Sequence, residues 1–210
     1  MDHLLPLFSI ILAIALGAIS PGPSFVLVAR TSIAGSRRAG LGTALGMGLG
    51  GLTFATLALL GLIALLAQVA WIYLGLKILG GLYLLYLGWR LWRGAREPLT
   101  VDTSGQTGRG FWRAMLLGLV TQLSNPKTAV VYAGIFAALL PAQPLPLWLA
   151  LALPTAIFTV EFVWYALVAT AFSAGGPRRV YLDAKSWIDR LAGGVMAALG
   201  LRLVFEGVRG

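Results

Sequence analysis

The feature that most constrains this chain is a series of long apolar runs separated by short polar segments. The runs cover residues 4–33, 40–66, 71–92, 111–140, 147–172 and 188–208. An α-helix of about 20 residues crosses the hydrocarbon core of a bilayer. Only 11% of the residues are charged, against about 25% in a typical soluble domain. The sequence therefore predicts an all-α membrane protein with six transmembrane helices and no soluble domain.

The basic residues predict the orientation of these helices. The connections after the first, third and fifth runs hold twelve of the 16 Lys and Arg residues: Arg30, Arg37, Arg38, Arg90, Arg93, Arg96, Arg109, Arg113, Arg178, Arg179, Lys185 and Arg190. The other two connections hold none. Because positively charged loops remain in the cytoplasm, both termini are predicted to lie outside. The net charge of +9 is then expected to serve topology and contact with anionic lipids rather than nucleic acid.

Two of the runs are interrupted near their middle by proline. The interruptions are residues 20–23 (SPGP) in the first run and Asn125-Pro126-Lys127 in the fourth. Ser20 and Asn125 are residue types favoured at helix N-caps, and the proline after each suits the first helical position. We predict that both spans break near the midplane and that a helix restarts after Ser20 and after Asn125.

The two halves of the chain match each other in order. Each half begins with a broken span, and residues 77–81 (KILGG) in the third span match residues 190–194 (RLAGG) in the sixth. Because a half of three spans reverses direction, the second half is inserted upside down. This predicts two inverted three-helix repeats, residues 1–93 and 111–210, joined by a flexible cytoplasmic loop at 94–110. Matched interruptions in inverted halves point to a transporter with its site between the repeats.

The charges near the breaks indicate what such a site binds. A helix that restarts inside the membrane has unpaired N–H groups and a partial positive charge at its first turn. Lys127 adds a full charge that costs about 2.5–3.5 kcal/mol in mid-membrane, and this combination suits a carboxylate. Glu161 is the acidic residue deep in a span. Burial disfavours its charged form, so it is expected to carry a proton or to meet a substrate ammonium. Together these groups predict an amino-acid substrate, with Glu161 coupling export to protons.

The candidate site residues surround the two breaks and Glu161. Those predicted to bind substrate are Ser20, Pro21, Gly22, Pro23, Ser24, Gln122, Asn125, Pro126, Lys127, Thr128 and Trp164. Lys77 and Arg190 are candidate gates, or alternatively interfacial anchors. Simpler interpretations remain open: Glu161 as a structural partner of Lys127, since a buried pair costs less than two lone charges, and prolines that only kink a packed helix. Asp183 and Asp189 are predicted to be solvated loop charges.

A glycine stripe marks the second run. Gly42, Gly46 and Gly50 recur at a spacing of four residues, which aligns small residues on one helix face and permits close helix packing. We expect this face to pack within the chain; a dimer interface is the alternative.

Several of these motifs together resemble the LysE/RhtB family of bacterial inner-membrane exporters. They are residues 20–23 (SPGP), 37–41 (RRAGL), the glycine-rich second run, 77–88 (KILGGLYLLYLG) and 118–127 (GLVTQLSNPK), in this order over essentially the whole chain. The resemblance implies a six-span fold and proton-driven efflux of amino acids or close derivatives such as threonine, homoserine or homoserine lactone. It also implies an inner-membrane location and often a homodimer.

Other functions are less well supported by the residues. A metal-cation or other small-solute exporter of the same superfamily is the main alternative, but the chain has no Cys, and its one His is His3 at the N-terminus. A membrane enzyme would need a nucleophile and a base, and Ser20, Ser24 and Thr128 have no His or second membrane acid to work with. A scaffold would not need two matched helix breaks with nearby charges. The sequence therefore predicts a transporter without metal or cofactor.

Overall fold

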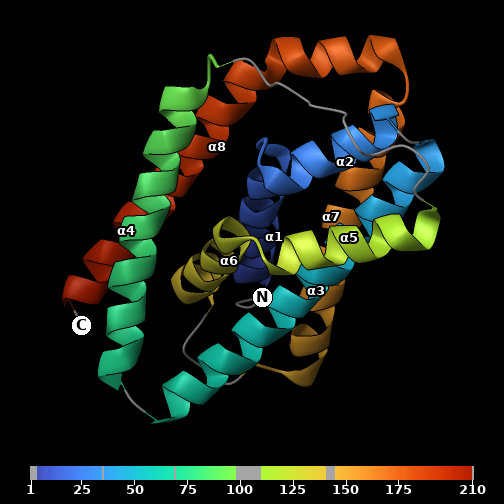
Figure 1. The fold of residues 1–210 in the computed structure, drawn as a ribbon. Coiled ribbons are helices and arrows are strands. Elements are labelled where there is room, and N and C mark those ends of the chain that lie inside the picture. Colours follow the sequence, from blue (N-terminus) through green and yellow to red (C-terminus); the bar gives the residue numbers. More distant parts are fainter. Residues whose placement is uncertain (1–3, 35, 69, 98–109, 141–144, 210) are drawn as a thin grey trace.

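The chain folds into helices throughout the part that the computed structural model describes, residues 4–34, 36–68, 70–97, 110–140 and 145–209 (Figure 1). The helices are α1 (Leu4–Ile19), α2 (Pro23–Ala34), α3 (Arg37–Gln68), α4 (Ala70–Gly94), α5 (Phe111–Leu123), α6 (Pro126–Leu139), α7 (Leu147–Phe172) and α8 (Gly175–Arg209). The all-α prediction is confirmed for these ranges. Most of the loop predicted at 94–110 lies outside the described residues.

Several helices have the length and composition of membrane spans. Within the described residues, these are the stretches Arg37–Gly61, Leu147–Phe172 and Arg179–Val208. Pro6–Ile19 and Pro23–Ala34 add a fourth if the pair, bent by 55°, is one broken span. α5 and α6 are apolar but have only 13 and 14 residues each. The fold is thus consistent with a multi-pass membrane protein, and six spans in inverted repeats stay a prediction.

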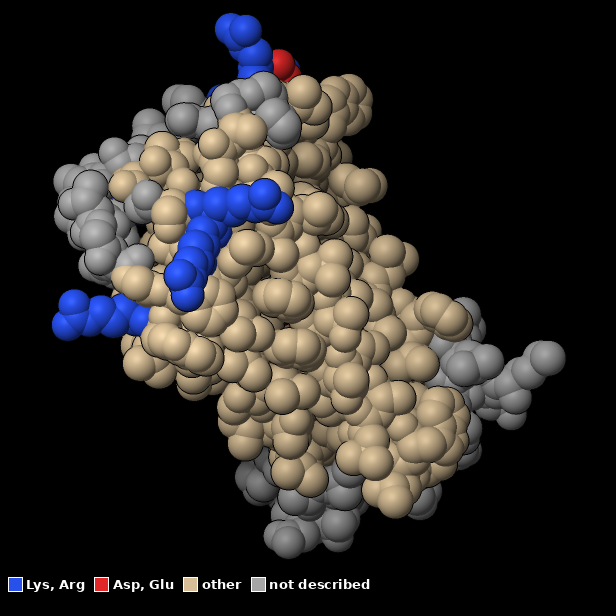
Figure 2. All heavy atoms as spheres, turned by 90° about the vertical axis from the view of Figure 1, so that its right-hand side faces the viewer, with Lys and Arg blue, Asp and Glu red and all other residues tan. Residues whose placement is uncertain are grey.

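The outer surface of the helices is suited to lipid. On α7, Leu151, Val163 and Leu167 are exposed, and Val163 and Leu167, four residues apart, share one helix face. Figure 2 shows one side of the molecule, where the visible charged side chains lie toward one end and a broad described surface below them carries none. Large apolar side chains are exposed on most of the helices, which is unusual on a soluble monomer and is expected of a helix bundle in a bilayer.

Glycines bring α4 and α8 into antiparallel backbone contact. A side-chain carbon at Gly81 would lie 2.8 Å from the Gly200 carbonyl oxygen, and one at Gly88 would lie 2.6 Å from the Gly193 carbonyl oxygen. The same positions on α8 are equally tight against α4. Only glycine permits backbones to approach this closely, so these residues determine how the two helices pair along their length (Figure 1).

The glycine stripe of α3 packs against α5. A side-chain carbon at Gly46 would meet the Met115 carbonyl oxygen and would lie 2.6 Å from the Leu119 nitrogen. One at Gly50 would lie 2.6 Å from Cβ of Gln122. The expectation of close packing within the chain is confirmed, and this face of α3 is not available to a second copy.

The first helix break differs in register from the prediction. α1 ends at Ile19 and α2 begins at Pro23, so the predicted restart after Ser20 is two residues too early. The residue before a proline is disfavoured in the helical region, which keeps Gly22 out of α2. Gly22 instead precedes the first turn and its carbonyl accepts from the Val26 N–H at 2.9 Å. Ser20 does not cap α2, because its N–H continues α1 by donating to the Leu16 carbonyl.

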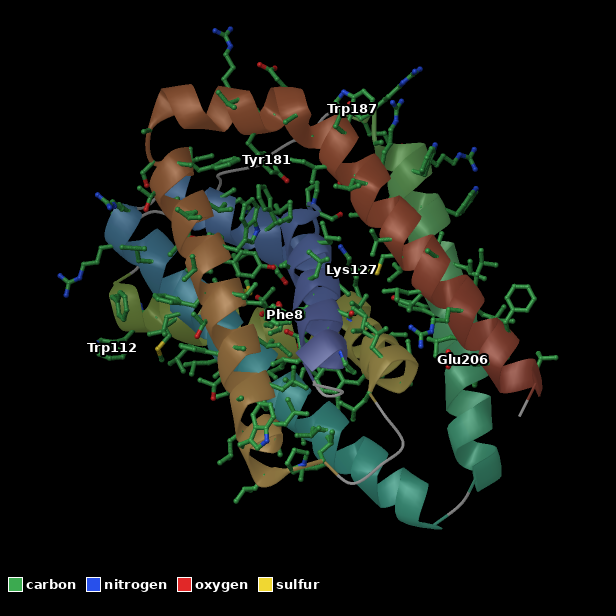
Figure 3. All side chains as sticks on the ribbon, turned by 180° about the vertical axis from the view of Figure 1, so that it is seen from behind. Phe8, Trp112, Lys127, Tyr181, Trp187 and Glu206 are labelled. Atoms are coloured by element: carbon green, nitrogen blue, oxygen red, sulfur yellow. The ribbon has the colours of Figure 1, made fainter. Side chains whose placement is uncertain are left out.

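Two aromatic side chains satisfy carbonyl groups at the broken end of α1. The Trp164 indole donates to the Ala18 carbonyl at 3.1 Å, and the Tyr181 hydroxyl donates to the Ile19 carbonyl at 3.1 Å. The last carbonyls of a helix have no partner within it, and in a membrane interior water is not there to replace one. α7 and α8 thereby stabilise the break, with Tyr181 reaching inward from α8 (Figure 3).

The substitution Tyr181→Phe should therefore lower stability. It removes one hydrogen bond, worth about 1 kcal/mol, while keeping a ring to stack on Phe25. We expect a lower apparent Tm in detergent. Tyr86→Phe, at an exposed position of α4, is the control that should match wild type. Equal Tm values for all three proteins would contradict the capping role of Tyr181.

The segment before the sixth run is helical, whereas its acidic residues were predicted to be solvated loop charges. α8 is a continuous helix from Gly175 to Arg209, and it bends near Trp187 so that its first part crosses one end of the molecule (Figure 3). The polar composition of this segment resembled that of a loop, but its charged residues lie on a helix with one side facing the protein. Asp183 is exposed as predicted, whereas Asp189 is only 3% exposed.

Candidate functional site

The two helix breaks meet at a small polar cavity in the interior. Its volume is about 30 Å³, which holds one or two water molecules. Predicted site residues among those that line it are Ser20, Gly22, Ser24, Gln122, Asn125, Lys127, Thr128 and Glu161. They come from both breaks and from α2, α5, α6 and α7. The structure thus brings most of the predicted residues to one place.

Asn125 positions the start of α6. Its backbone is extended, its side-chain oxygen accepts from the Lys127 N–H at 3.1 Å, and Pro126 occupies the first helical turn. This is the N-cap arrangement predicted for the second break, in which the side chain satisfies one of the unpaired N–H groups. As a result, the side chains of Lys127 and Thr128 emerge from the first turn of α6 beside the cavity.

A chain of hydrogen bonds connects Glu161 to that helix start. The Gln122 amide donates to the Glu161 carboxylate at 3.0 Å, and the Ser24 hydroxyl donates to the Gln122 carbonyl oxygen at 2.6 Å. The Asn125 amide in turn donates to Ser24 at 3.2 Å. All four side chains are buried. A change at the carboxylate can therefore reach both helix breaks through polar contacts that have little freedom to rearrange independently.

The ammonium group of Lys127 lies next to the start of α2 as well as α6. A side-chain carbon at Gly22 would lie 3.3 Å from Lys127 Nζ, and Figure 3 places Lys127 near the middle of the molecule. Helix starts carry partial positive charge, so a cation here gains nothing from them. Among the described residues Lys127 forms no ion pair, and Glu161 is held by Gln122 instead. Three positive features therefore converge where an anion would be stabilised.

A larger vestibule leads to the same point. It has a volume of about 490 Å³, within the range of about 300–1,000 Å³ typical of small-molecule sites. Gly22, Asn125 and Lys127 line both the vestibule and the small cavity. The remaining predicted residues at the breaks, Pro21, Pro23 and Pro126, line the vestibule alone, together with side chains of α4 and α8. Lys127 thus lies at the boundary between the two spaces.

Asp189 was missed as a site residue because it was assigned to a loop. Its carboxylate accepts from the Ser20 hydroxyl at 3.3 Å and forms an ion pair with Lys185 at 2.8 Å. Lys185 also donates to the carbonyl oxygens of Gly94 and Ala95. The four-residue spacing of Lys185 and Asp189, which is favourable on one helix face, is the signal that would have placed both on a helix.

Tyr132 was also missed, and one predicted tryptophan lies elsewhere. Tyr132 and Tyr165 line the small cavity and are buried, with the Tyr132 hydroxyl beside Glu161. Tyr165 follows Glu161 by four residues and so shares its face of α7, as expected of a residue beside Glu161 that could face the cavity. Trp164, predicted to bind substrate, lines neither space; its indole is used at the end of α1.

The candidate gates stay predictions. The guanidinium of Arg190 lies 5.8 Å from the centre of the Trp187 ring, a cation–π distance. The side chain of Lys77 lies outside the described residues.

Helices with a lipid-suited surface, two broken segments and an interior polar site define the class of an α-helical membrane transporter. Comparison with known families matches residues 15–207 to the LysE type translocator family, and the chain belongs to that family. This agrees with the prediction of a transporter rather than an enzyme.

Characterised and uncharacterised relatives cover nearly the whole chain. The chain is 31% identical to a threonine efflux protein of Salmonella typhimurium over 95% of its own length and 97% of the relative's. It is 31% identical to a threonine efflux protein of Escherichia coli K12, over 89% and 91%. Identity to YahN, an uncharacterized membrane protein of E. coli K12, is 32% over 97% and 92%. No solved structure matches the chain significantly.

Proposed function

We propose that this protein exports neutral amino acids or close derivatives, such as threonine, homoserine or homoserine lactone, across the bacterial inner membrane in exchange for protons. The observation that carries the proposal is the position of the Lys127 ammonium, at the starts of α2 and α6 and at the inner end of the vestibule. The named threonine efflux relatives support the substrate class.

In this proposal the substrate carboxylate binds at Lys127. Pro23 and Pro126 have no N–H, and the Lys127 N–H is taken by Asn125. The N–H groups of Ser24, Phe25 and Thr128, in the first turns of α2 and α6, have no partner within their helices, so they would add donors to the ammonium. The carboxylate would neutralise one full and two partial positive charges in a site with little water, where charge-assisted hydrogen bonds are strong. Ser24 and Thr128, which also line the cavity, add hydroxyl groups within the same space.

Glu161 is proposed as the proton-coupling residue. Its buried carboxyl group is joined through Gln122 and Ser24 to Asn125 at the start of α6. Protonation removes a charge from one end of this chain and changes which atoms can accept hydrogen bonds. Because the chain ends at the proposed carboxylate site, proton binding and substrate binding are expected to influence each other.

The membrane arrangement is proposed to be two inverted repeats of three spans, with both termini outside. The reciprocal contacts of Gly81 with Gly200 and of Gly88 with Gly193 support a symmetric pairing of α4 and α8. The vestibule is lined by Arg90 and Arg93, which the positive-inside rule assigns to the cytoplasm. This structure then corresponds to a state with its vestibule open to the cytoplasm and a site too small for substrate. The homodimer implied by the family resemblance stays a prediction.

Efflux of radiolabelled amino acids from proteoliposomes tests the function directly. Proteoliposomes with wild-type protein should release preloaded threonine faster than protein-free liposomes do. A proton gradient directed inward, with the external solution more acidic, should increase the rate. Efflux equal to that of protein-free liposomes, for all of the common neutral amino acids, would overturn the proposal. An efflux rate that does not change with the proton gradient would contradict only the proton-coupling part of the proposal.

The substitution Glu161→Gln tests the coupling residue. Gln cannot take up a proton at this position, so the variant is expected to lose the acceleration by a pH gradient while still transporting down a substrate gradient. The measurement is the ratio of efflux rates with and without the gradient, which should fall to about one. Glu206→Gln, on α8 in an exposed ion pair with Arg202, should keep the wild-type ratio. A wild-type ratio in Glu161→Gln would exclude Glu161 as the proton site.

A further inference from the structure

The vestibule contains a buried carboxylate that the proposed mechanism has not used. Asp189 is 3% exposed and lines the vestibule together with Lys127. Glu97, the other acidic residue in the lining, is exposed at the end of α4. Asp189 is therefore the acidic group placed deep in this space, beside the residue proposed to hold the substrate carboxylate.

Asp189 and Lys127 face a common space without touching. Both side chains line the vestibule, yet the described residues contain no ion pair between them. Asp189 is paired with Lys185 instead, so the Lys127 ammonium has no carboxylate partner among the described residues although a buried carboxylate lines the same space. A molecule that carries an ammonium and a carboxylate at neighbouring positions complements both groups.

We propose that Asp189 is a substrate-binding residue that receives the α-ammonium group of the amino acid while Lys127 receives its carboxylate. This assignment rests on the proposed export function and deepens it. Glu161 then remains the proton-coupling group, and the two buried carboxylates have separate roles. The α-ammonium and carboxylate groups of the substrate are then recognised in the vestibule, and the side chain of the substrate must be distinguished by other residues.

Lys185 is the internal cation that the substrate displaces. Its ammonium pairs with Asp189 at 2.8 Å and also donates to the Gly94 and Ala95 carbonyls at 3.3 and 3.4 Å. The two carbonyls keep Lys185 partly satisfied when the substrate takes its place at Asp189. The exchange gives Asp189 one ammonium in place of another, so its buried carboxylate is never left unpaired, a state that is strongly unfavourable.

Ser20 orients the acceptor. Its hydroxyl donates to the second carboxylate oxygen of Asp189 at 3.3 Å, and each carboxylate oxygen can accept more than one hydrogen bond. Because Ser20 follows directly on α1 at the first break, a substrate bound to Asp189 would be linked to that break through one further hydrogen bond.

The test compares threonine with 3-hydroxybutyrate, the same molecule without its ammonium group, as inhibitors of radiolabelled threonine efflux in proteoliposomes. Wild-type protein should prefer threonine, and Asp189→Asn should lose that preference by about ten-fold or more, since a hydrogen bond between charged groups is removed. Threoninol, which lacks the carboxylate, should bind poorly to both proteins. Asp183→Asn, an exposed acid on the same helix, should behave as wild type.

The substitution Lys185→Gln separates binding from structural support. Removing the competing cation should increase the affinity for threonine several-fold, whereas Asp189→Asn should decrease it. A merely structural ion pair predicts that both substitutions weaken transport together, and this outcome would overturn the assignment. If Asp189→Asn proves too unstable to assay, weaker threonine binding by Lys185→Gln alone would overturn it. Unchanged preference in Asp189→Asn would overturn it as well. A wild-type protein without threonine-dependent transport would instead overturn the exporter proposal on which the assignment rests.

Discussion

Replacing Lys127 by methionine is expected to reduce threonine efflux by about 30-fold or more. Methionine keeps an unbranched chain of similar length but has no charge, so the substrate carboxylate loses its ammonium partner. Loss of one member of a buried, hydrogen-bonded charge pair costs about 2–5 kcal/mol of binding. The measurement is the initial rate of efflux from proteoliposomes with equal amounts of incorporated protein.

The control for Lys127→Met is Arg113→Met. Arg113 is an exposed cation near the start of α5, away from the lining of the cavity and the vestibule. Efflux by this variant should remain within about two-fold of wild type, since exposed charges contribute little. An efflux rate close to that of wild type in Lys127→Met would show that binding of the substrate carboxylate does not depend on Lys127.

A valine at position 46 is expected to prevent stable folding. The Cβ atom of the new side chain would meet the Met115 carbonyl oxygen and would lie 2.6 Å from the Leu119 nitrogen. These are backbone atoms of α5, so they cannot move aside as a flexible side chain can. Overpacking typically lowers the free energy of unfolding by about 1–3 kcal/mol and sometimes more. Because Gly46→Val would force α3 away from α5, we expect its destabilisation to lie at or above the upper end of this range.

Gly61→Ala is the matched control in the same helix. A side-chain carbon at Gly61 would have no neighbour within 4 Å in the described structure, and alanine favours a helix over glycine by about 1 kcal/mol. This variant should be at least as stable as wild type. The measurements are the yield of monodisperse protein in detergent and its apparent Tm. Normal yield and Tm in Gly46→Val would mean that α3 and α5 are not packed at this position.

The helices and their interruptions were largely predictable from the sequence. Long apolar runs in a membrane must satisfy their own backbone groups, and a helix is the simple way to do so. Prolines then show where a run cannot continue. The exact restart of α2 was predicted two residues too early, because Ser20-Pro21 and Gly22-Pro23 both have the local features of a helix start. The choice between them depended on the backbone preference of the residue before Pro23.

The candidate site was predictable only where it depends on local features. Lys127 and the residues of the two breaks attract attention because each is costly inside a span. Asp189 did not, since in a segment taken for a loop a charged residue needs no explanation. Its role depends on Ser20, 169 residues away in the chain, and on Lys185 in a helix that had not been predicted. Trp164 was assigned by its nearness to Glu161 in sequence, but its ring turns toward the end of α1.

The sequence by itself determined the class of protein, the LysE-type motifs, the positions of the breaks to within two residues and the positive charge at Lys127. These follow from hydrophobic length, proline stereochemistry and the energetic cost of charge in lipid, which act over a few neighbouring residues. Only the tertiary structure decided which polar groups meet. Backbone contacts at Gly46, Gly81 and Gly88 determine how α3, α4 and α8 approach their partners. That packing brings Glu161 within hydrogen-bond distance of Gln122 and places Asp189 in the vestibule that Lys127 also lines. Side chains far apart in sequence come together only where helices are in contact.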